Sequence, residues 1–286
     1  MKEIVYLNGS LVSQSEAKVP AFDYGFLYGY GLFETMRAYS GYVFRLGPHL
    51  DRLFSSARTL GINLQSTSND LENALYDILQ ANSLTDARLR LTISGGEGDA
   101  SPDLSGSKGP TVLVTARSYH SPSPQKAFTA AVSAIRRNSC SPLSRVKSLN
   151  YLDNLLARRE ARTAGADEAI LLNEKGFLAE ASVCNVFLVS HGALITPDKD
   201  SGILPGITRQ VIMELGLDRG IEVRETNVSL EELWQADEAF LTNSMIEIAP
   251  LVRIDDRTIG SGMAGEVTQA LAQTYTQLVH AECELT

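Results

Sequence analysis

The sequence predicts an α+β protein with two domains, a small N-terminal domain over residues 1–118 and a larger C-terminal domain over residues 126–286. With 286 residues, of which 44% are hydrophobic, the chain can bury one large core or two medium-sized cores. Strand-like and helix-like segments are mixed in the first domain, whereas strand-like segments dominate the second. Between them, YHSPSPQ (119–125) is short, polar and proline-bearing, which is typical of an interdomain linker.

The first domain is expected to open with a β-hairpin. IVYL (4–7) and SLV (10–12) flank Asn8-Gly9, the pair that favours a type I′ turn because both turn residues need positive φ. Apolar residues at helical spacing then predict two helices, and alternating residues predict two strands. The helices are HLDRLFSSARTLG (49–61) and DLENALYDILQAN (70–82), and the strands are ARLRLTIS (87–94) and PTVLVTAR (110–117).

The second domain is predicted to combine strands and hairpins with a few helices. Two hairpins are expected to turn at 173–176 and at 191–192. The strand signals are FTAAVSAIRR (128–137), EAILLNEKGFLAE (168–180), NVFLVSHGALITP (185–197) and EAFLTN (238–243). The helix signals are LNYLDNLLARREAR (149–162), TRQVIMELG (208–216) and GEVTQALAQTYTQLVHA (265–281).

Composition argues against several classes of partner. The chain has 25 basic and 34 acidic residues and no basic run, so we expect neither a nucleic-acid nor a membrane partner. Three scattered cysteines and four scattered histidines show no metal-ligand spacing, so no metal site is expected. MKEIVYLNGSLV (1–12) lacks the apolar run of a signal peptide, and no stretch has the ~20 apolar residues of a membrane helix. We therefore expect a soluble, cytoplasmic protein.

One lysine stands out by its surroundings. In SRVKSLNYLDN (144–154), Lys147 follows a strand-like run and precedes the segment with helical spacing. A lysine at such a junction is well placed to form a Schiff base with an aldehyde cofactor. The alternative is a solvated loop lysine, which is the commoner environment for this residue.

Two further segments suit the remaining parts of such a cofactor. Glu180, in LAEASVCNVFLV (178–189), lies between two apolar strands and could pair with a protonated ring nitrogen; the alternative is an exposed glutamate at a hairpin end. In SGILPGITRQVIMELG (201–216), a Pro-Gly turn leads into a helix that begins around Ile207-Thr208. Free N–H groups there, with the threonine hydroxyl, suit a phosphate, unless Thr208 merely caps its helix.

Taken in order, these motifs resemble the class IV aminotransferases, the fold-type IV pyridoxal-phosphate enzymes. The family includes branched-chain and D-amino-acid aminotransferases, (R)-selective amine transaminases and aminodeoxychorismate lyases. The resemblance rests on KSLNYLDN (147–154), EASVCNVF (180–187) and GILPGITR (202–209), with support from residues 23–57 and from LTNSMIEIAPL (241–251). It implies a homodimer, and a cofactor that lies between a small N-terminal domain and a larger, barrel-like C-terminal domain.

The resemblance also implies roles for individual residues. Lys147 would form the internal aldimine and then move the proton between the substrate Cα and the cofactor C4′, and Glu180 would keep the pyridine nitrogen protonated. Tyr151 would lie near the cofactor's 3′ oxygen. The phosphate ligands would be Arg52, the N–H groups of Ile207 and Thr208, and the hydroxyls of Thr208 and Ser244. An arginine and a helix N-terminus are the groups that a dianionic phosphate requires.

The substrate is less defined than the cofactor. By similarity, the substrate wall would comprise Tyr28, Phe33, Thr35 and Arg37. Thr35 stands where branched-chain enzymes typically have glycine. Residues 95–106 contain no arginine, although many family members place a carboxylate-binding arginine there. Arg88, Arg90 or Arg37 would then bind the carboxylate, unless the substrate is an amine without one.

The preferred hypothesis is an aminotransferase that acts on branched-chain or other hydrophobic L-amino acids with 2-oxoglutarate. The first alternative is an aminodeoxychorismate lyase that releases pyruvate and 4-aminobenzoate. The second is a D-amino-acid or (R)-amine transaminase. A non-catalytic pyridoxal-phosphate-binding protein would be expected to lack Lys147 or Glu180, and both are present.

Overall fold

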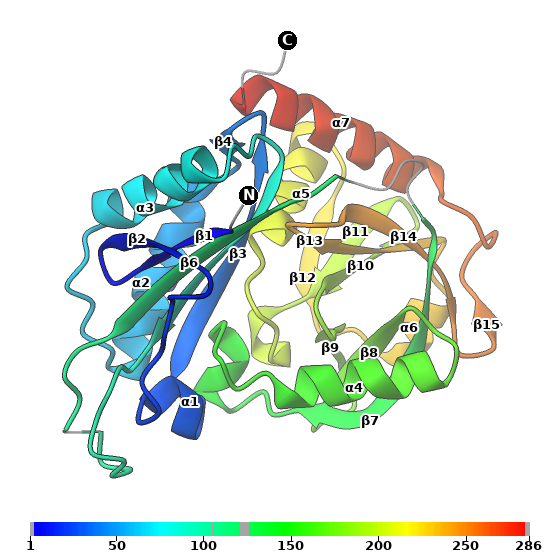
Figure 1. Ribbon diagram of the computed structural model, residues 1–286. Coiled ribbons are helices and arrows are strands. Elements are labelled where there is room, and N and C mark those ends of the chain that lie inside the picture. The colour runs from blue at the N-terminus through cyan, green and yellow to red at the C-terminus, as the bar shows by residue number, and fades with distance from the viewer. Residues whose placement is uncertain (1–2, 105, 121–125, 284–286) are drawn as a thin grey trace. The chain divides into compact units, whose positions relative to one another are not determined.

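A computed structural model of the protein describes residues 3–104, 106–120 and 126–283, and the chain divides into two compact units (Figure 1). The first unit comprises residues 1–120 with 146–150 and 281–286, and the second comprises 121–145 with 151–280. Most of the predicted linker, residues 121–125, lies outside the described residues. The short segment 146–150, which contains Lys147, is grouped with the first unit although it is distant from that unit in the sequence.

The first unit is built on a six-stranded antiparallel sheet with the order β2-β1-β6-β5-β3-β4. The Asn8-Gly9 turn is confirmed: the two residues have φ values of 47° and 92° and join β1 to β2. The strands are β1 (Ile4–Leu7), β2 (Ser10–Ser13), β3 (Gly31–Tyr39), β4 (Tyr42–Val43), β5 (Ala87–Ser94) and β6 (Thr111–Ser118). The helices are α1 (Tyr24–Tyr28), α2 (Leu46–Leu60) and α3 (Ser68–Ala81).

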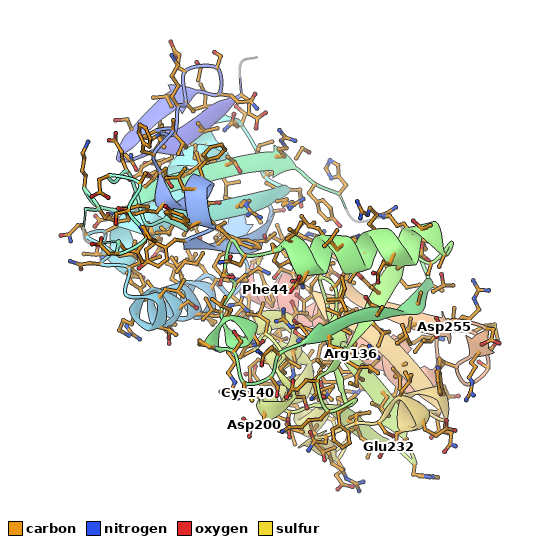
Figure 2. The ribbon with its side chains drawn as sticks, turned by 90° about the horizontal axis from the view of Figure 1, so that it is seen from below. Phe44, Arg136, Cys140, Asp200, Glu232 and Asp255 are labelled. Atoms are coloured by element: carbon orange, nitrogen blue, oxygen red, sulfur yellow. The ribbon has the colours of Figure 1, made fainter. Side chains whose placement is uncertain are left out.

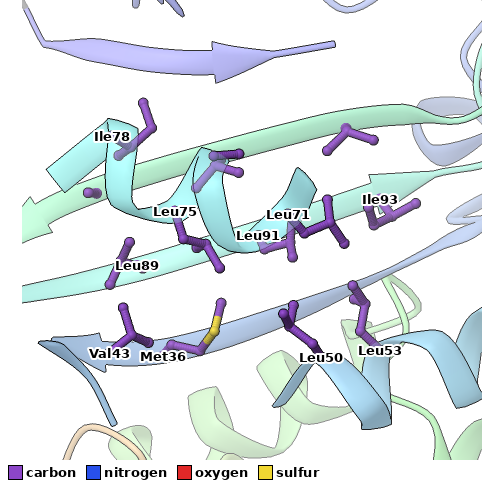
Figure 3. Close-up of a cluster of buried hydrophobic side chains, with 14 of the residues drawn as sticks. Met36, Val43, Leu50, Leu53, Leu71, Leu75, Ile78, Leu89, Leu91 and Ile93 are labelled. Carbon is purple, nitrogen blue, oxygen red and sulfur yellow. The ribbon is translucent and has the colours of Figure 1, made fainter. Parts of the chain in front are cut away.

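The hydrophobic core of the unit lies on one face of this sheet. Met36 and Leu89, on neighbouring strands, lie in one cluster with Leu50 of α2 and Leu75 of α3, and all four are essentially buried (Figure 3). Both helices are amphipathic, as their sequence spacing predicts, so each turns one apolar stripe to the sheet. Because side chains alternate along a strand, the residues between these core positions lie on the opposite face.

The second unit is built on a nine-stranded mixed sheet with the order β12-β11-β10-β13-β14-β7-β8-β9, and β15 pairs with β14. Strand β9 also lies close to β10 and β11, so the sheet curls on itself, as expected for a barrel-like domain. The strands are β7 (Phe128–Arg137), β8 (Glu168–Asn173), β9 (Leu178–Ala181), β10 (Asn185–Ser190), β11 (Ala193–Pro197), β12 (Val223–Thr226), β13 (Glu238–Asn243), β14 (Glu247–Ile254) and β15 (Arg257–Thr258).

The sheet of the second unit combines two hairpins with one long-range parallel pairing. Both predicted hairpins, β8–β9 and β10–β11, are present. Strand β14 pairs in parallel with β7, far away in the sequence, and Asp255 strengthens this junction (Figure 2). The backbone N–H of Asp255 donates to the Ala130 carbonyl, and its carboxylate accepts a hydrogen bond from the Val132 N–H.

Three helices follow predicted segments: α4 (Leu152–Thr163), α5 (Ile207–Asp218) and α7 (Glu266–Glu282), the last of which ends in residues grouped with the first unit. The short helix α6 (Leu230–Trp234) was not predicted. Across the described ranges, no helix combines the length and apolar composition that a membrane crossing requires. Two short 3₁₀ helices, Pro142–Arg145 and Lys199–Ser201, complete the helical elements of the described chain.

Candidate cofactor and active site

Lys147 lies on a segment that runs alongside the start of β3. The Phe33 N–H donates to the Lys147 carbonyl at 2.9 Å, and the Leu149 N–H donates to the Gly31 carbonyl at 2.9 Å. The predicted strand before the lysine is present as β7, but it ends at Arg137, and the 3₁₀ helix Pro142–Arg145 lies between it and the lysine. The lysine segment pairs with β3 through an isolated bridge between Leu32 and Ser148. Lys147 is half-buried, and backbone hydrogen bonds fix its segment to β3 on both sides of the lysine. It is therefore not the fully solvated loop lysine of the alternative interpretation.

The face of the first sheet that points away from the core carries the predicted substrate residues of β3. Phe33, Thr35 and Arg37 alternate along β3, so all three lie on this face. The Lys147 Nζ lies 4.6 Å from the centroid of the Phe33 ring, and the Arg90 guanidinium carbon lies 3.8 Å from the same centroid. One aromatic ring therefore contacts both an amine and a guanidinium, a favourable arrangement because the ring face is electronegative.

Arg37 and Tyr28, the other predicted wall residues, have separate surroundings. The Arg37 guanidinium lies over the Tyr39 ring at 4.2 Å and over the Tyr119 ring at 5.0 Å. Tyr28 ends α1, and its hydroxyl donates to the Ala100 carbonyl in the loop after β5. The structure thus brings Phe33 together with Lys147 and Arg90, whereas the Tyr28 hydroxyl contacts the loop.

Arg52 is held by a buried carboxylate and a histidine. Its Nε and one terminal nitrogen donate to the two oxygens of Glu34 at 2.8 and 2.6 Å, a bidentate pair. His49 Nδ1 lies 2.8 Å from a Glu34 oxygen, and both Glu34 and His49 are buried. Glu34 and His49 were not predicted as site residues, although Glu34 is adjacent to Phe33 and His49 lies one helical turn before Arg52.

The electrostatics of this cluster are set by burial and by Arg52. Burial alone would raise the pKa of Glu34, but the Arg52 charge and the hydrogen bonds from His49 and Arg52 outweigh it and lower that pKa from 4.5 to about 2. Burial lowers the pKa of His49, and the charges of Arg52 and Lys147 lower it further against the opposing effect of Glu34. The cluster therefore holds an ionised Glu34, a neutral His49 and a charged Arg52 near neutral pH.

We expect this cluster to stabilise the fold in a pH-dependent way. Because the folded-state pKa of Glu34 lies below its ordinary value, its contribution is present above pH 4.5 and is lost as the pH falls toward 2. The loss amounts to up to about 3 kcal/mol of unfolding free energy. Urea unfolding at a series of pH values measures it: a Glu34→Gln variant should show a shallower fall between pH 4.5 and 2 than the wild type. Asp51→Asn, which alters an exposed carboxylate on the same helix, is the control, and equal slopes for wild type and Glu34→Gln would contradict the expectation.

Glu180 lies in the second unit and is buried rather than exposed at a hairpin end. One of its oxygens pairs with Arg137 at 2.9 Å, and the other accepts a hydrogen bond from the Leu204 N–H at 2.9 Å. Arg137 also donates to the carbonyls of Gly202 and Ser144. Sequence reasoning missed Arg137, which is the last residue of β7 and was not distinguishable there from its neighbour Arg136.

The predicted anion site lies at the start of α5. The helix begins at Ile207 after Gly206, which makes no side-chain capping bond, so Thr208 is not the cap and lies buried in the first turn. A Cβ at position 206 would lie 2.0 Å from the Asn185 Oδ1, so this close approach requires glycine. Leu204, which donates to Glu180, lies three residues before Ile207, so the carboxylate and the helix N-terminus belong to one short stretch of structure.

Tyr151 and Ser244 are the remaining residues of the predicted cofactor set. The Tyr151 hydroxyl donates to the Ser182 carbonyl at 3.3 Å, and burial, followed by the negative charges of Glu180, Cys184 and Glu168, raises its pKa well above 10. Ser244 follows β13. Near the end of that strand, the Thr242 hydroxyl oxygen is buried and has no hydrogen-bond partner among the described residues. A buried hydroxyl without a partner is costly unless a bound group satisfies it.

These groups match the parts of pyridoxal phosphate. A half-buried lysine suits the aldehyde, and a buried carboxylate suits the ring nitrogen. In the first unit an arginine suits a phosphate, and in the second unit a helix N-terminus and hydroxyl groups, Thr242 among them, also suit one. These are the kinds of group that a pyridoxal-phosphate-dependent enzyme requires.

Comparison with known proteins gives the family. The model of the family "Amino-transferase class IV" matches residues 31–254, and the chain belongs to this family. A "Putative branched-chain-amino-acid aminotransferase" from Methanocaldococcus jannaschii is 40% identical over 96% of both chains. An "Aminodeoxychorismate lyase" from Bacillus subtilis is 37% identical over 95% of this chain and 93% of its own. A crystal structure of the branched-chain amino acid aminotransferase from Thermobaculum terrenum in its PLP form is 30% identical, covers 98% of this chain and 94% of its own, and has a TM-score of 0.90.

Proposed function

We propose that this enzyme transfers an amino group between a branched-chain or other hydrophobic L-amino acid and 2-oxoglutarate. The observation that carries the proposal is the Phe33 ring, which contacts both the Lys147 amine and the Arg90 guanidinium. The Lys147 amine can carry out the chemistry, and the Arg90 guanidinium can bind a carboxylate. Both groups lie against the apolar ring of Phe33. This combination suits a substrate that has both an apolar side chain and a carboxylate.

The cofactor residues are proposed from the chemistry of each group. When bound, pyridoxal phosphate supplies the aldehyde that takes up the amino group and the ring that accepts electrons. Lys147 binds the aldehyde carbon and afterwards holds and delivers a proton at its Nζ. Glu180 accepts a hydrogen bond from the protonated ring nitrogen, and Arg137 and Leu204 fix its carboxylate for this contact.

The phosphate ligands act as a set. Arg52 is oriented by its bidentate pair with Glu34, which fixes the plane of its guanidinium group and thus the direction of its charge. The N–H groups of Ile207 and Thr208 add the positive end of a helix, and the Thr208 and Ser244 hydroxyls add neutral donors. Tyr151 is assigned to a position near the cofactor's 3′ oxygen, and its raised pKa keeps its hydroxyl protonated.

Arg90 is the best-placed arginine for a substrate carboxylate. It is half-buried on β5 and contacts Phe33, whereas Arg88, two residues earlier, is exposed. Thr35 is the partner of Arg90 in the pairing of β3 with β5, so its side chain occupies space on the same face of the sheet, beside Arg90. Two acidic residues of the loop after β5 have partners: Asp99 accepts a hydrogen bond from Tyr24 of α1, and Glu97 pairs with Lys108.

An aminodeoxychorismate lyase is the second candidate. The 37% identity to the Bacillus subtilis lyase over nearly the full chain favours it, and a lyase would use Lys147 and Glu180 in the same way. The two reactions differ in what leaves: pyruvate and 4-aminobenzoate in the lyase, and a 2-oxo acid in the aminotransferase.

Single amino donors decide between these reactions. We expect L-leucine, L-isoleucine or L-valine, added alone to the holoenzyme, to convert the visible band of the bound cofactor to the pyridoxamine form, and 2-oxoglutarate to restore it. Aminodeoxychorismate should yield no pyruvate, and D-alanine and (R)-1-phenylethylamine should leave the band unchanged. Pyruvate release together with no response to the three L-amino acids would make the enzyme a lyase, and a response to D-alanine or the amine alone would reverse the stereochemical assignment.

A matched pair of variants tests the carboxylate assignment in the same assay. Arg90→Met removes the guanidinium against Phe33, whereas Arg88→Met removes an exposed one from the same face of the same strand. Loss of a bidentate charged contact costs about 1.5–3 kcal/mol, so Arg90→Met should raise the KM of L-leucine roughly 10-fold to 100-fold, and Arg88→Met should not. Equal KM values for the two variants would remove Arg90 from the substrate site.

A homodimer in the cytoplasm is proposed as the working state. Around α1 the first unit exposes large apolar side chains, with Phe22 at 55% and Phe26 at 78% exposure. Large exposed apolar side chains that cluster in this way are typical of protein–protein interfaces. A second copy of the chain is the partner that the resemblance implies.

A further inference from the structure

Glu168 is a fully buried carboxylate that the proposed chemistry does not use. It opens β8, its exposure is 0%, and its partners among the described residues are all neutral. One oxygen accepts hydrogen bonds from the Ser182 hydroxyl and the Ala169 N–H, and the other lies 3.8 Å from the Cys184 sulfur. A buried carboxyl group needs hydrogen-bond partners, and those of Glu168 lead to two other parts of the second unit.

Ser182 connects this carboxylate to the start of α4. While its hydroxyl donates to Glu168, its backbone carbonyl accepts from the Tyr151 hydroxyl at 3.3 Å and from the Asn154 side-chain amide at 2.7 Å. Its N–H also donates to the Ala169 carbonyl. Every polar group of Ser182 is therefore engaged, and its carbonyl has one defined direction.

The other oxygen of Glu168 leads elsewhere. Cys184 accepts a hydrogen bond from the Asn243 amide at 3.1 Å, and the Asn243 side-chain oxygen accepts from the N–H groups of Met245 and Ile246. The carboxylate thus has two arms, one through Ser182 to Tyr151 and one through Cys184 to the turn that contains Ser244. The Ser182 arm has the shorter path and the stronger donors.

We propose that Glu168 is a positioning residue, which fixes the Ser182 carbonyl through the Ser182 hydroxyl and thereby orients the Tyr151 hydroxyl and the Asn154 amide. This rests on the proposed function only in that Tyr151 is assigned to the cofactor. The hydrogen-bonded network itself consists of residues of the chain and is testable without any cofactor. Glu168 acts through Ser182.

Two alanine variants separate the arms. Ser182→Ala removes the hydroxyl that links Glu168 to Tyr151, and Cys184→Ala removes the contact at the other oxygen and leaves Ser182 in place. In apoprotein labelled with ¹³C at tyrosine Cζ, the Tyr151 signal is assigned by its loss in Tyr151→Phe. We expect this signal to move in Ser182→Ala and to keep its wild-type position in Cys184→Ala.

The holoenzyme supplies a second readout. In Ser182→Ala we expect the pH midpoint of the cofactor's visible band to shift and kcat to fall by up to about 100-fold, with the KM of L-leucine little changed, because a misplaced group slows the chemical step. Glu168→Gln keeps an acceptor oxygen for Ser182 and should retain the wild-type midpoint, whereas Glu168→Ala should behave like Ser182→Ala.

The outcomes are separable. A lower melting temperature for Ser182→Ala with an unmoved Tyr151 signal and an unmoved midpoint would overturn the proposal and leave Glu168 a purely structural residue. An equal displacement of the Tyr151 signal in Ser182→Ala and Cys184→Ala would also overturn it. If the wild type accepts no amino donor, the proposed function fails, but the apoprotein signal still decides whether Glu168 positions Tyr151.

Discussion

Replacement of Lys147 by alanine is expected to remove the visible absorption band of the bound cofactor and to lower kcat by roughly 10⁴-fold, the upper range for loss of a positioned proton donor and acceptor. The side chain is half-buried beside Phe33, and the backbone of its segment is fixed by hydrogen bonds to β3. The substitution therefore removes one amine without disturbing the pairing that holds the segment. Absorbance spectra and steady-state rates of the purified variant measure both effects.

Lys175 is the matched control for this experiment. It is an exposed lysine in the β8–β9 turn, so Lys175→Ala should retain both the band and the rate. Added methylamine should restore part of the rate of Lys147→Ala, since a free amine can carry the same proton. A visible band in Lys147→Ala that equals that of the wild type would rule out the assignment.

Replacement of Glu180 by glutamine is expected to lower kcat on the order of 10²- to 10³-fold, because the charge that stabilises the protonated ring nitrogen is lost. The variant should also lose up to about 3 kcal/mol of stability, since Arg137 remains without its counter-charge in a largely buried place. Arg137 keeps its bonds to the Gly202 and Ser144 carbonyls, which limits the loss. Rates with L-leucine and urea unfolding curves measure the two effects.

Glu222→Gln gives the comparison, since Glu222 forms an exposed pair with Arg224 and solvent screens such pairs so strongly that they contribute little to stability. A Glu180→Gln enzyme that has wild-type kcat but reduced stability would show that this carboxylate only holds Arg137. In that case the ring nitrogen would need another partner.

Most of the secondary structure and the principal chemical groups could be predicted without the fold. Local signals sufficed for the Asn8-Gly9 turn, for α2 and α3, and for both hairpins of the second unit, because propensity and spacing act within a few residues. The order of the lysine, glutamate and helix-start motifs was enough to identify the family, which residues 31–254 confirm. The spacing did not predict the path of the chain between the expected strand and Lys147: a 3₁₀ helix lies between β7 and the lysine segment.

The groups that support these residues became visible only in three dimensions. Arg137 meets Glu180 across 43 positions of the sequence, and Glu34 meets Arg52 across 18, because the strands and helices that carry them are neighbours in the fold. The register of β3 and β5 places Thr35 opposite Arg90, and the segment pairing beside β3 brings Lys147 to Phe33. Glu168 shows no signal in the sequence at all, since a buried carboxylate in a strand is recognisable only from its surroundings. Local physics selects the elements and the reactive side chains, whereas long-range pairing selects the partners that set their charge and direction.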